Sequence, residues 1–398
     1  MRPFSVFPHP IHEGVVPTYV GTALSQKVKI MQFEAAVFVE PKQPLEIETV
    51  KLARLGPYDV LVRMEAAGLC HTDWEAQQGS LPVPAPMILG HEGAGIVEDI
   101  GAEVTQVRPG QKVVCTIHPA CGQCYYCRRG QPMLCEPMLS SHHNGTLLDG
   151  NTRLEWGGKP LHQFMNVGSF GEYAVVPERG AVPIPEAVPS DRACILACAV
   201  ITGVGAVTRV AKVEYGARVA IVGCGPVGLN VVQGAAQVGA ETIIAVDTAA
   251  ERLAFAEKLG ATHVVNAAEC DAAKQVRRLT GGRGADYVFE AAGSEVGFQS
   301  ALDAARPGGT VVLLGKVDAQ RKVSLRFGSL MGEKHIIRSS LGGSCAHDDY
   351  PAYAQSYLSG KLELDAFITA RMPLQEINRG MDRLARGEMI RGVVIYTR

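Results

Sequence analysis

The fold of this chain is decided by residues 218–247, RVAIVGCGPVGLNVVQGAAQVGAETIIAVD. An apolar run typical of a buried strand leads into Gly223, Gly225 and Gly228, a helical pattern follows, and a second apolar run ends at Asp247. The glycines permit a tight turn, the start of the helix can bind a pyrophosphate, and an acid about 20 residues on can accept the hydroxyls of an adenosine ribose. Strand, helix, second strand and terminal acid therefore together predict a dinucleotide-binding unit.

The same stretch predicts which dinucleotide binds. The candidate cofactor-binding residues are Gly223, Gly225, Pro226, Val227, Gly228 and Asp247. The Asp247 carboxylate would repel a 2′-phosphate, and residues 248–250 contain no Arg to receive one. NAD is therefore expected rather than NADP.

The regions around this unit follow two different patterns. Up to about residue 338 strands and helices alternate, with six strands expected in all, which predicts a doubly wound parallel sheet of the α/β class. Residues 31–180 instead show short strands and turns, which predicts a mostly antiparallel, β-rich region. A length of 398 residues also favours two domains over one.

A cysteine cluster is the strongest local signal in the β-rich region. Cys121, Cys124, Cys127 and Cys135 follow the spacing Cys-x2-Cys-x2-Cys-x7-Cys within a loop rich in Gly and Pro. Four thiolates so close together would repel one another without a metal, and tetrahedral zinc is the usual occupant of a closed, structural four-cysteine site. An iron–sulfur cluster is a minor alternative, because the spacing is not ferredoxin-like.

A second set of metal-ligating residues lies upstream, in residues 68–95. Cys70 and His91 are both ligands that zinc accepts, and an open catalytic site needs three protein ligands. The third must come from a distance, and Cys198 is the candidate. Taken alone, Cys70 could be a small buried hydrophobe and His91 a core histidine; their neighbours favour the metal.

Composition excludes several classes of protein. A net charge of −2 gives no reason to expect nucleic acid or an anionic membrane as a partner, and no apolar run approaches the roughly 20 residues of a membrane span. The 11 Cys, six of them in metal-like positions, indicate a reducing compartment, and the cytoplasm is expected. Residues 1–30 lack the pattern of a secretory signal and are expected to form a flexible extension.

An open metal site, a four-cysteine loop, a dinucleotide fold and a returning C-terminal segment together resemble the zinc-dependent medium-chain alcohol dehydrogenases, specifically the liver-type branch. The resemblance covers nearly all of residues 31–398. It implies a GroES-like catalytic domain, residues 31–199 and 341–398, and a Rossmann cofactor domain, residues 200–340. It also implies two zinc ions per chain, with Cys70, His91 and Cys198 at the catalytic one, bound NAD, and a homodimer.

The resemblance further implies a mechanism and residue roles. A zinc-bound alkoxide would pass hydride to NAD⁺, with Thr72 on the alcohol oxygen and at the start of a proton path. Asp73 and Glu92 would orient the metal ligands. The remaining roles are contacts with the cofactor: His71 and Arg391 at the pyrophosphate, Arg252 at the adenosine ribose, and Thr202 at the nicotinamide.

The sequence departs from the family pattern at three points. Glu75 stands where the proton path often ends on a His; it either accepts the proton or is a solvated loop carboxylate, since no partner for it is visible in the sequence. Residues 137–139 are Pro-Met-Leu, where glutathione-dependent formaldehyde dehydrogenases carry an Arg for the carboxylate of their substrate. Lys316 is a charge beside the expected nicotinamide site for which the sequence offers no explanation.

These features lead to one main functional prediction. The expected pocket positions are all apolar: Leu81, Ile117, Phe164 and Met165. The chain is therefore expected to interconvert a hydrophobic primary alcohol, aromatic alcohols included, and its aldehyde. An oxidoreductase with permanently bound NAD and a different electron acceptor is the alternative. A non-enzymatic zinc-binding module is disfavoured by the complete cofactor fingerprint.

Overall fold

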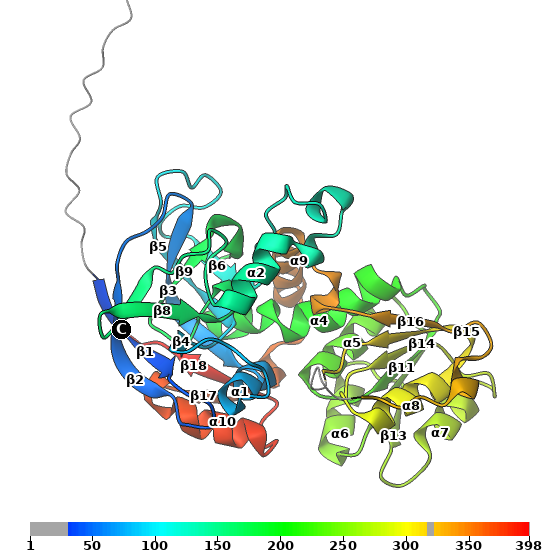
Figure 1. Cartoon of the computed structure of the whole chain (residues 1–398). Coiled ribbons are helices and arrows are strands. Elements are labelled where there is room, and N and C mark those ends of the chain that lie inside the picture. The colour runs from blue at the N-terminus through cyan, green and yellow to red at the C-terminus, as the bar shows by residue number, and fades with distance from the viewer. Residues whose placement is uncertain (1–30, 317–321, 398) are drawn as a thin grey trace, which may run out of the picture.

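The computed structural model of the chain describes residues 31–316 and 322–397. The expected N-terminal extension, residues 1–30, lies outside the described residues. Figure 1 shows a β-rich half and a half built on one sheet, with α4 and α9 between them. This arrangement confirms the predicted fold class of a β-rich region beside a doubly wound α/β region.

The second half is a six-stranded sheet in the order β13-β12-β11-β14-β15-β16, and all five strand pairings are parallel. The strands are β11 Arg218–Val222, β12 Thr242–Asp247, β13 His263–Asn266, β14 Ala285–Glu290, β15 Ala305–Leu313 and β16 His335–Arg338. The helices that follow the first four are α5 Pro226–Gln237, α6 Ala250–Lys258, α7 Ala272–Leu279 and α8 Glu295–Ala304. Strand order reverses between β11 and β14, where such sheets bind ligands at their carboxyl edge.

The continuous apolar runs of these strands have a direct cause in the packing. Val219 and Ile221 of β11 belong to one hydrophobic core, while Ala220 and Val222 belong to another on the opposite face of the sheet. Successive side chains of a strand point to opposite faces, so a sheet covered on both sides needs apolar residues at every position.

The β-rich half contains a closed barrel and a seven-stranded sheet. The barrel strands are β1 Met31–Phe38, β2 Glu46–Leu52, β7 Leu154–Trp156, β8 Lys159–Gln163 and β4 Met87–Ile88. The sheet strands are β10 Ala181–Pro183, β6 Lys112–Cys115, β5 Glu92–Ile100, β3 Asp59–Leu69, β9 Tyr173–Pro177, β18 Arg391–Ile395 and β17 Ile368–Met372. Because β18 pairs antiparallel with β3, the C-terminal segment returns to the half in which the described chain begins.

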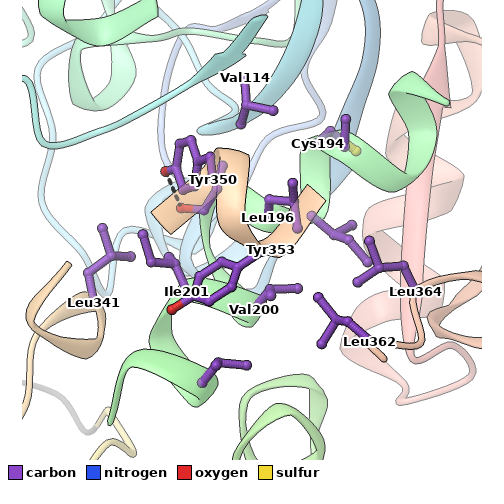
Figure 2. Close-up of a cluster of buried hydrophobic side chains, with 14 of the residues drawn as sticks. Val114, Cys194, Leu196, Val200, Ile201, Leu341, Tyr350, Tyr353, Leu362 and Leu364 are labelled. Carbon is purple, nitrogen blue, oxygen red and sulfur yellow. Dashed lines mark hydrogen bonds between the residues drawn. The ribbon is translucent and has the colours of Figure 1, made fainter. Parts of the chain in front are cut away.

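The remaining helices lie around this half or at its junction with the other. They are α1 His71–Gln78, α2 Glu136–Asn144, α3 Ser190–Ala193, α4 Ala199–Gly205, α9 Ala346–Leu358 and α10 Ile377–Ala385. Figure 2 shows the apolar core at the junction, where Val114 of β6, Leu196 and Ile201 pack around Tyr350 of α9. The Tyr350 hydroxyl donates a hydrogen bond to the Ala197 carbonyl at 3.4 Å. This core fixes the backbone next to Cys198.

Within the described residues, no single helix has the length and apolar composition needed to cross a membrane. One bent pair of helical segments, Ser190–Ala197 and Ala199–Ala211, passes that test only when its two parts are taken together across a 53° bend.

Candidate active site and metal centres

Asp73 organises the first group of metal-ligating residues. It lies in the first turn of α1, fully buried, and its Oδ2 accepts a hydrogen bond from the Cys70 amide at 3.2 Å. Its Oδ1 accepts one from the Gly90 amide at 3.1 Å and lies 2.9 Å from His91 Nδ1. One carboxylate therefore fixes both the backbone of Cys70 and the ring of His91, which leaves His91 Nε2 available as a ligand.

Four potential ligand atoms converge at this point. Those of Cys70, His91, Glu92 and Cys198 all lie within 4.8 Å of one another. Cys70 is the residue before α1, Glu92 begins β5, and Cys198 lies between a short 3-10 turn and α4. The structure thus brings the distant Cys198 to the two ligands that are close in sequence. It also brings Glu92, predicted only as an orienting group, into the same cluster.

The electrostatics of this cluster suit a cation. The hydrogen bond between the two thiols lowers the pKa of Cys70 well below its usual range. The same hydrogen bond, together with burial and the Cys70 charge, raises the pKa of Cys198 well above its own usual range. Burial lowers the pKa of His91, but the Asp73 and Cys70 charges outweigh it and raise that pKa well above the usual value. Without a cation, only one of the two thiols can carry a charge, whereas a bound metal allows both to do so.

Arg391 lies beneath this cluster. Its side chain is only 4% exposed; Nη1 donates to the Leu69 carbonyl at 2.7 Å and lies 3.1 Å from Glu92 Oε1. Glu92 Oε2 is buried and has no hydrogen-bond partner among the described residues. A buried carboxylate with one oxygen within 4.8 Å of two thiol sulfurs and an imidazole nitrogen fits a divalent cation. Arg391 is predicted to contact the pyrophosphate of the cofactor, and the structure places its guanidinium in this buried ion pair with Glu92.

The four-cysteine loop forms a second cluster. The sulfurs of Cys121, Cys124, Cys127 and Cys135 also lie within 4.8 Å of one another. The amide of Cys124 donates to Cys121 Sγ at 3.4 Å, and the amide of Cys121 donates to Cys135 Sγ at 3.3 Å. Burial raises the pKa of Cys127 to about 12 and also raises that of Cys135, so the four thiols need a cation to ionise together. Four sulfurs at this spacing fit tetrahedral zinc. All 11 cysteines of the chain are free of disulfides.

The glycine-rich turn has the backbone shape that dinucleotide binding requires. Gly223 has φ +96°, and a Cβ there would lie 2.6 Å from the Ala292 amide nitrogen. A Cβ on Gly228 would clash with the Gly223 carbonyl oxygen, which explains the close approach of α5 to β11. By contrast, a Cβ on Gly225 would meet nothing within 4 Å. Open space before Pro226 and Val227, at the start of α5, suits a pyrophosphate.

Asp247 ends β12 beside this turn, and its carboxylate already orders the backbone. Oδ2 accepts from the Cys224 amide at 2.7 Å, and Oδ1 accepts from the Thr248 and Ala249 amides at 2.8 and 2.9 Å. Each oxygen can accept a further hydrogen bond from a ribose hydroxyl. Arg252 Nη1 lies 3.9 Å from Asp247 Oδ2, so the residue expected at the ribose is adjacent to it.

The other predicted cofactor and pocket residues come from separate elements. His71 is exposed at the start of α1, and the Thr202 amide of α4 donates to the Cys198 carbonyl at 2.9 Å. Phe164, 2% exposed, lies edge-on to the His91 ring with 5.9 Å between centroids. Met165 has φ +50° and packs against both large cores, a strained backbone of the kind found near functional sites. Ile117 is buried, and Leu81 is half-buried.

Glu75 has a partner that the sequence did not reveal. Its Oε2 lies 2.5 Å from Lys316 Nζ. This ion pair joins α1 to the segment that follows β15. The interpretation of Glu75 as a loop carboxylate without a partner is therefore wrong, because Glu75 lies in α1 and forms an ion pair. The two charges that the sequence could not explain neutralise each other, across 241 positions of the chain.

Comparison with known proteins identifies the family. Residues 56–186 match the model of the alcohol dehydrogenase GroES-like domain, and residues 226–359 match that of the zinc-binding dehydrogenases. The S-(hydroxymethyl)glutathione dehydrogenase of Paracoccus denitrificans is 36% identical over 375 residues, which cover 92% of this chain and 100% of that protein.

Two solved structures are similar over almost the whole fold. One is an alcohol dehydrogenase zinc-binding domain protein from Burkholderia ambifaria, 35% identical with a TM-score of 0.88, covering 93% of this chain and 100% of the other. The benzyl alcohol dehydrogenase of Acinetobacter calcoaceticus is 30% identical with a TM-score of 0.87, covering 92% and 100%. With both family models, the ligand clusters and the dinucleotide turn in agreement, the chain belongs to the zinc-dependent medium-chain alcohol dehydrogenases, oxidoreductases that bind NAD(P).

Proposed function

We propose that this chain is an NAD-dependent dehydrogenase that interconverts a hydrophobic primary alcohol, aromatic alcohols included, and its aldehyde. The observation that carries the proposal is the convergence of Cys70, His91 and Cys198 beside the buried ring of Phe164. A zinc ion at such a site acts as a Lewis acid that lowers the pKa of a bound alcohol. The expected pocket residues are all apolar, Leu81, Ile117, Phe164 and Met165, which favours an apolar substrate over a charged one.

We assign the metal ligands and their supports as follows. Cys70, His91 and Cys198 hold the catalytic zinc, with Asp73 orienting His91 and with Glu92 beside the ion. Cys121, Cys124, Cys127 and Cys135 hold the structural zinc. Thr72, in the first turn of α1, hydrogen-bonds the alcohol oxygen and accepts its proton.

NAD binds across the carboxyl edge of the parallel sheet. The turn Gly223–Gly228 would hold the pyrophosphate together with His71 and Arg391, and Asp247 and Arg252 would hold the adenosine ribose. Thr202 lies at the nicotinamide. Asp247 is 8% exposed, and a negative charge held there disfavours a 2′-phosphate.

The choice of substrate class depends on α2. The relatives named S-(hydroxymethyl)glutathione dehydrogenase raise the question whether this chain acts on the same compound. The residues after Cys135 form α2, whose sequence EPMLSSHHN contains no Arg or Lys. Leu139, 47% exposed, lies in the stretch where a cation for a substrate carboxylate is expected. The absence of that cation favours an uncharged alcohol.

A direct comparison of substrates tests this proposal. Reduction of NAD⁺ is measured with benzyl alcohol, with aliphatic primary alcohols and with S-(hydroxymethyl)glutathione, using wild type and Leu139→Arg. Wild type should prefer the uncharged alcohols in kcat/KM, and Leu139→Arg should raise kcat/KM for the glutathione adduct only. A wild type that prefers the glutathione adduct would overturn the proposed substrate class.

We also propose two features of organisation. The catalytic domain comprises residues 31–199 and 341–398, and the cofactor domain residues 200–340. The chain forms a homodimer through the edge of β16, which has no second strand neighbour among the described residues and exposes Ile336 and Ile337 at 42% and 36%. Sedimentation of the purified protein tests the dimer.

A further inference from the structure

The ion pair between Glu75 and Lys316 joins the two halves of the chain beside the proposed site. Glu75 lies on α1 three positions after Thr72, so the two side chains share one face of the helix. Lys316 follows β15 at the carboxyl edge of the parallel sheet, where a dinucleotide binds. The Glu75–Lys316 ion pair, with 2.5 Å between Oε2 and Nζ, therefore links the helix that carries Thr72 to the edge of the sheet where the cofactor is proposed to bind.

The backbone is anchored at both ends of this pair. The Glu75 carbonyl accepts hydrogen bonds from the Leu81 amide and the Ser80 hydroxyl, both at 3.1 Å. At the other end, Gly293 has φ +64°, and a Cβ there would lie 2.5 Å from the Lys316 carbonyl oxygen. The turn around Gly293 is itself held by Glu290, whose Oε1 accepts from the Gly293 amide at 2.8 Å and whose carbonyl accepts from the Gly315 amide at 2.8 Å.

The exposure of the two side chains argues against a purely structural role. Glu75 and Lys316 are 26% and 42% exposed, and ion pairs that solvent reaches contribute little to the stability of a fold. A carboxylate that keeps contact with solvent can, however, receive a proton and pass it to water. Without Lys316 the Glu75 side chain would be free to turn away from Thr72, because the described residues give its carboxylate no other partner.

We propose that Lys316 is a positioning residue that holds the Glu75 carboxylate as the last protein acceptor of the alcohol proton. This inference rests on the proposed function. In oxidation the alcohol loses a hydride, which reduces NAD⁺, and a proton, which leaves through Thr72. The Glu75 carboxylate takes up that proton to become the carboxylic acid, and it returns to the carboxylate by giving the proton to water. The acceptor is thus assembled from both halves of the chain.

The test compares the variants Lys316→Met, Lys316→Arg, Glu75→Gln and the double variant Glu75→Gln/Lys316→Met. Lys274→Met is the matched control, because Lys274 also forms an ion pair, 3.0 Å from Asp271, but at an exposed position on α7. Lys316→Met should lower kcat about tenfold and change KM for the alcohol about twofold or less, since a positioned proton acceptor contributes to turnover rather than to binding. Lys316→Arg should restore most of kcat.

The double variant separates a shared role from two independent ones. If Lys316 acts through Glu75, the double variant should be no slower than Glu75→Gln alone. Rate losses that multiply in the double variant, or a Lys316→Met enzyme as active as Lys274→Met, would overturn the proposal.

A second measurement does not depend on activity. The ¹³C resonance of the Glu75 carboxyl carbon, assigned with Glu75→Gln and followed in protein without cofactor, should change in Lys316→Met, because the ammonium 2.5 Å from the carboxylate is removed, and should stay at its wild-type position in Lys274→Met. An unchanged Glu75 resonance in Lys316→Met would contradict the positioning role. If wild type instead oxidises no primary alcohol, the proposed function fails, whereas the resonance still reports whether Lys316 holds the Glu75 carboxylate.

Discussion

Replacing Asp73 with Asn should release zinc from one site and leave the other loaded. The Asp73 carboxylate receives hydrogen bonds on both oxygens, from the Cys70 amide on one side and from the Gly90 amide and His91 Nδ1 on the other. An Asn side chain offers one acceptor oxygen and one donor NH₂ group, so at one of these contacts two hydrogen-bond donors would face each other. The orientation of Cys70 or of His91 is lost in either arrangement.

The size of the effect follows from the role of Asp73. Removing a group that orients a metal-binding imidazole costs roughly 10- to 100-fold in metal affinity, which corresponds to about 1.4–2.7 kcal/mol. We expect the upper part of this range, because Asp73 supports two ligands rather than one and is fully buried. The four-cysteine cluster shares no hydrogen bond with Asp73 in the described structure, so its affinity should not change.

Competition with a chromogenic chelator, combined with elemental analysis, measures both sites. Wild type should hold two zinc ions per chain, and Asp73→Asn should lose one of them at a lower chelator concentration. Asp59→Asn is the matched control: Asp59 is also a buried carboxylate, 5% exposed, which accepts from the Gly56 amide at 2.6 Å and pairs with Arg153. Asp59→Asn should lower thermal stability and retain both ions. Equal zinc affinity in Asp73→Asn and wild type would refute the reasoning.

Four further predictions follow from the sites. Cys121→Ser should leave about one zinc ion per chain and lower Tm, because a structural zinc site contributes directly to folding; two ions in this variant would contradict the assignment. Asp247→Gly should weaken NAD use and relax the exclusion of NADP, measured as the ratio of kcat/KM for the two cofactors, and a wild type that prefers NADP would show the reading of β12 to be wrong. Thr72→Ala should lower kcat about 10²-fold or more, as expected for loss of a positioned proton-transfer group, and normal turnover in it would remove Thr72 from the mechanism. Burial lowers the pKa of His118 to about 3, so the folded chain keeps this ring neutral while the unfolded chain protonates it at its ordinary value near 6.5. The contribution of neutral His118 to the free energy of unfolding is therefore complete above pH 6.5 and declines as the pH falls, by about 2 kcal/mol at pH 5. His118→Asn should remove this decline, so the fall of Tm between pH 6.5 and 4 should be smaller than in wild type.

Local patterns in the sequence were sufficient for much of the structure. Residues 218–247 predict β11, α5 and β12 in order, because the turn glycines, the apolar runs and the final acid act through neighbouring backbone. The four cysteines of the loop are within 15 positions of one another, so their spacing alone predicts a shared site. The apolar character of residues 219–222 of β11 likewise predicts a sheet covered on both faces.

Tertiary structure decided the contacts between distant residues. The core around Tyr350 fixes the backbone next to Cys198, which lies with Cys70 and His91. The pairing of β18 with β3 places Arg391 beside Glu92. The pairing of Glu75 with Lys316 depends on how the two halves meet, which no local propensity encodes. Short-range conformational preferences and residue spacing thus determined the helices and strands and the choice of metal-ligand residues. Packing between elements far apart in the chain determined which charges neutralise one another, and it left Glu92 Oε2 buried without a hydrogen-bond partner among the described residues.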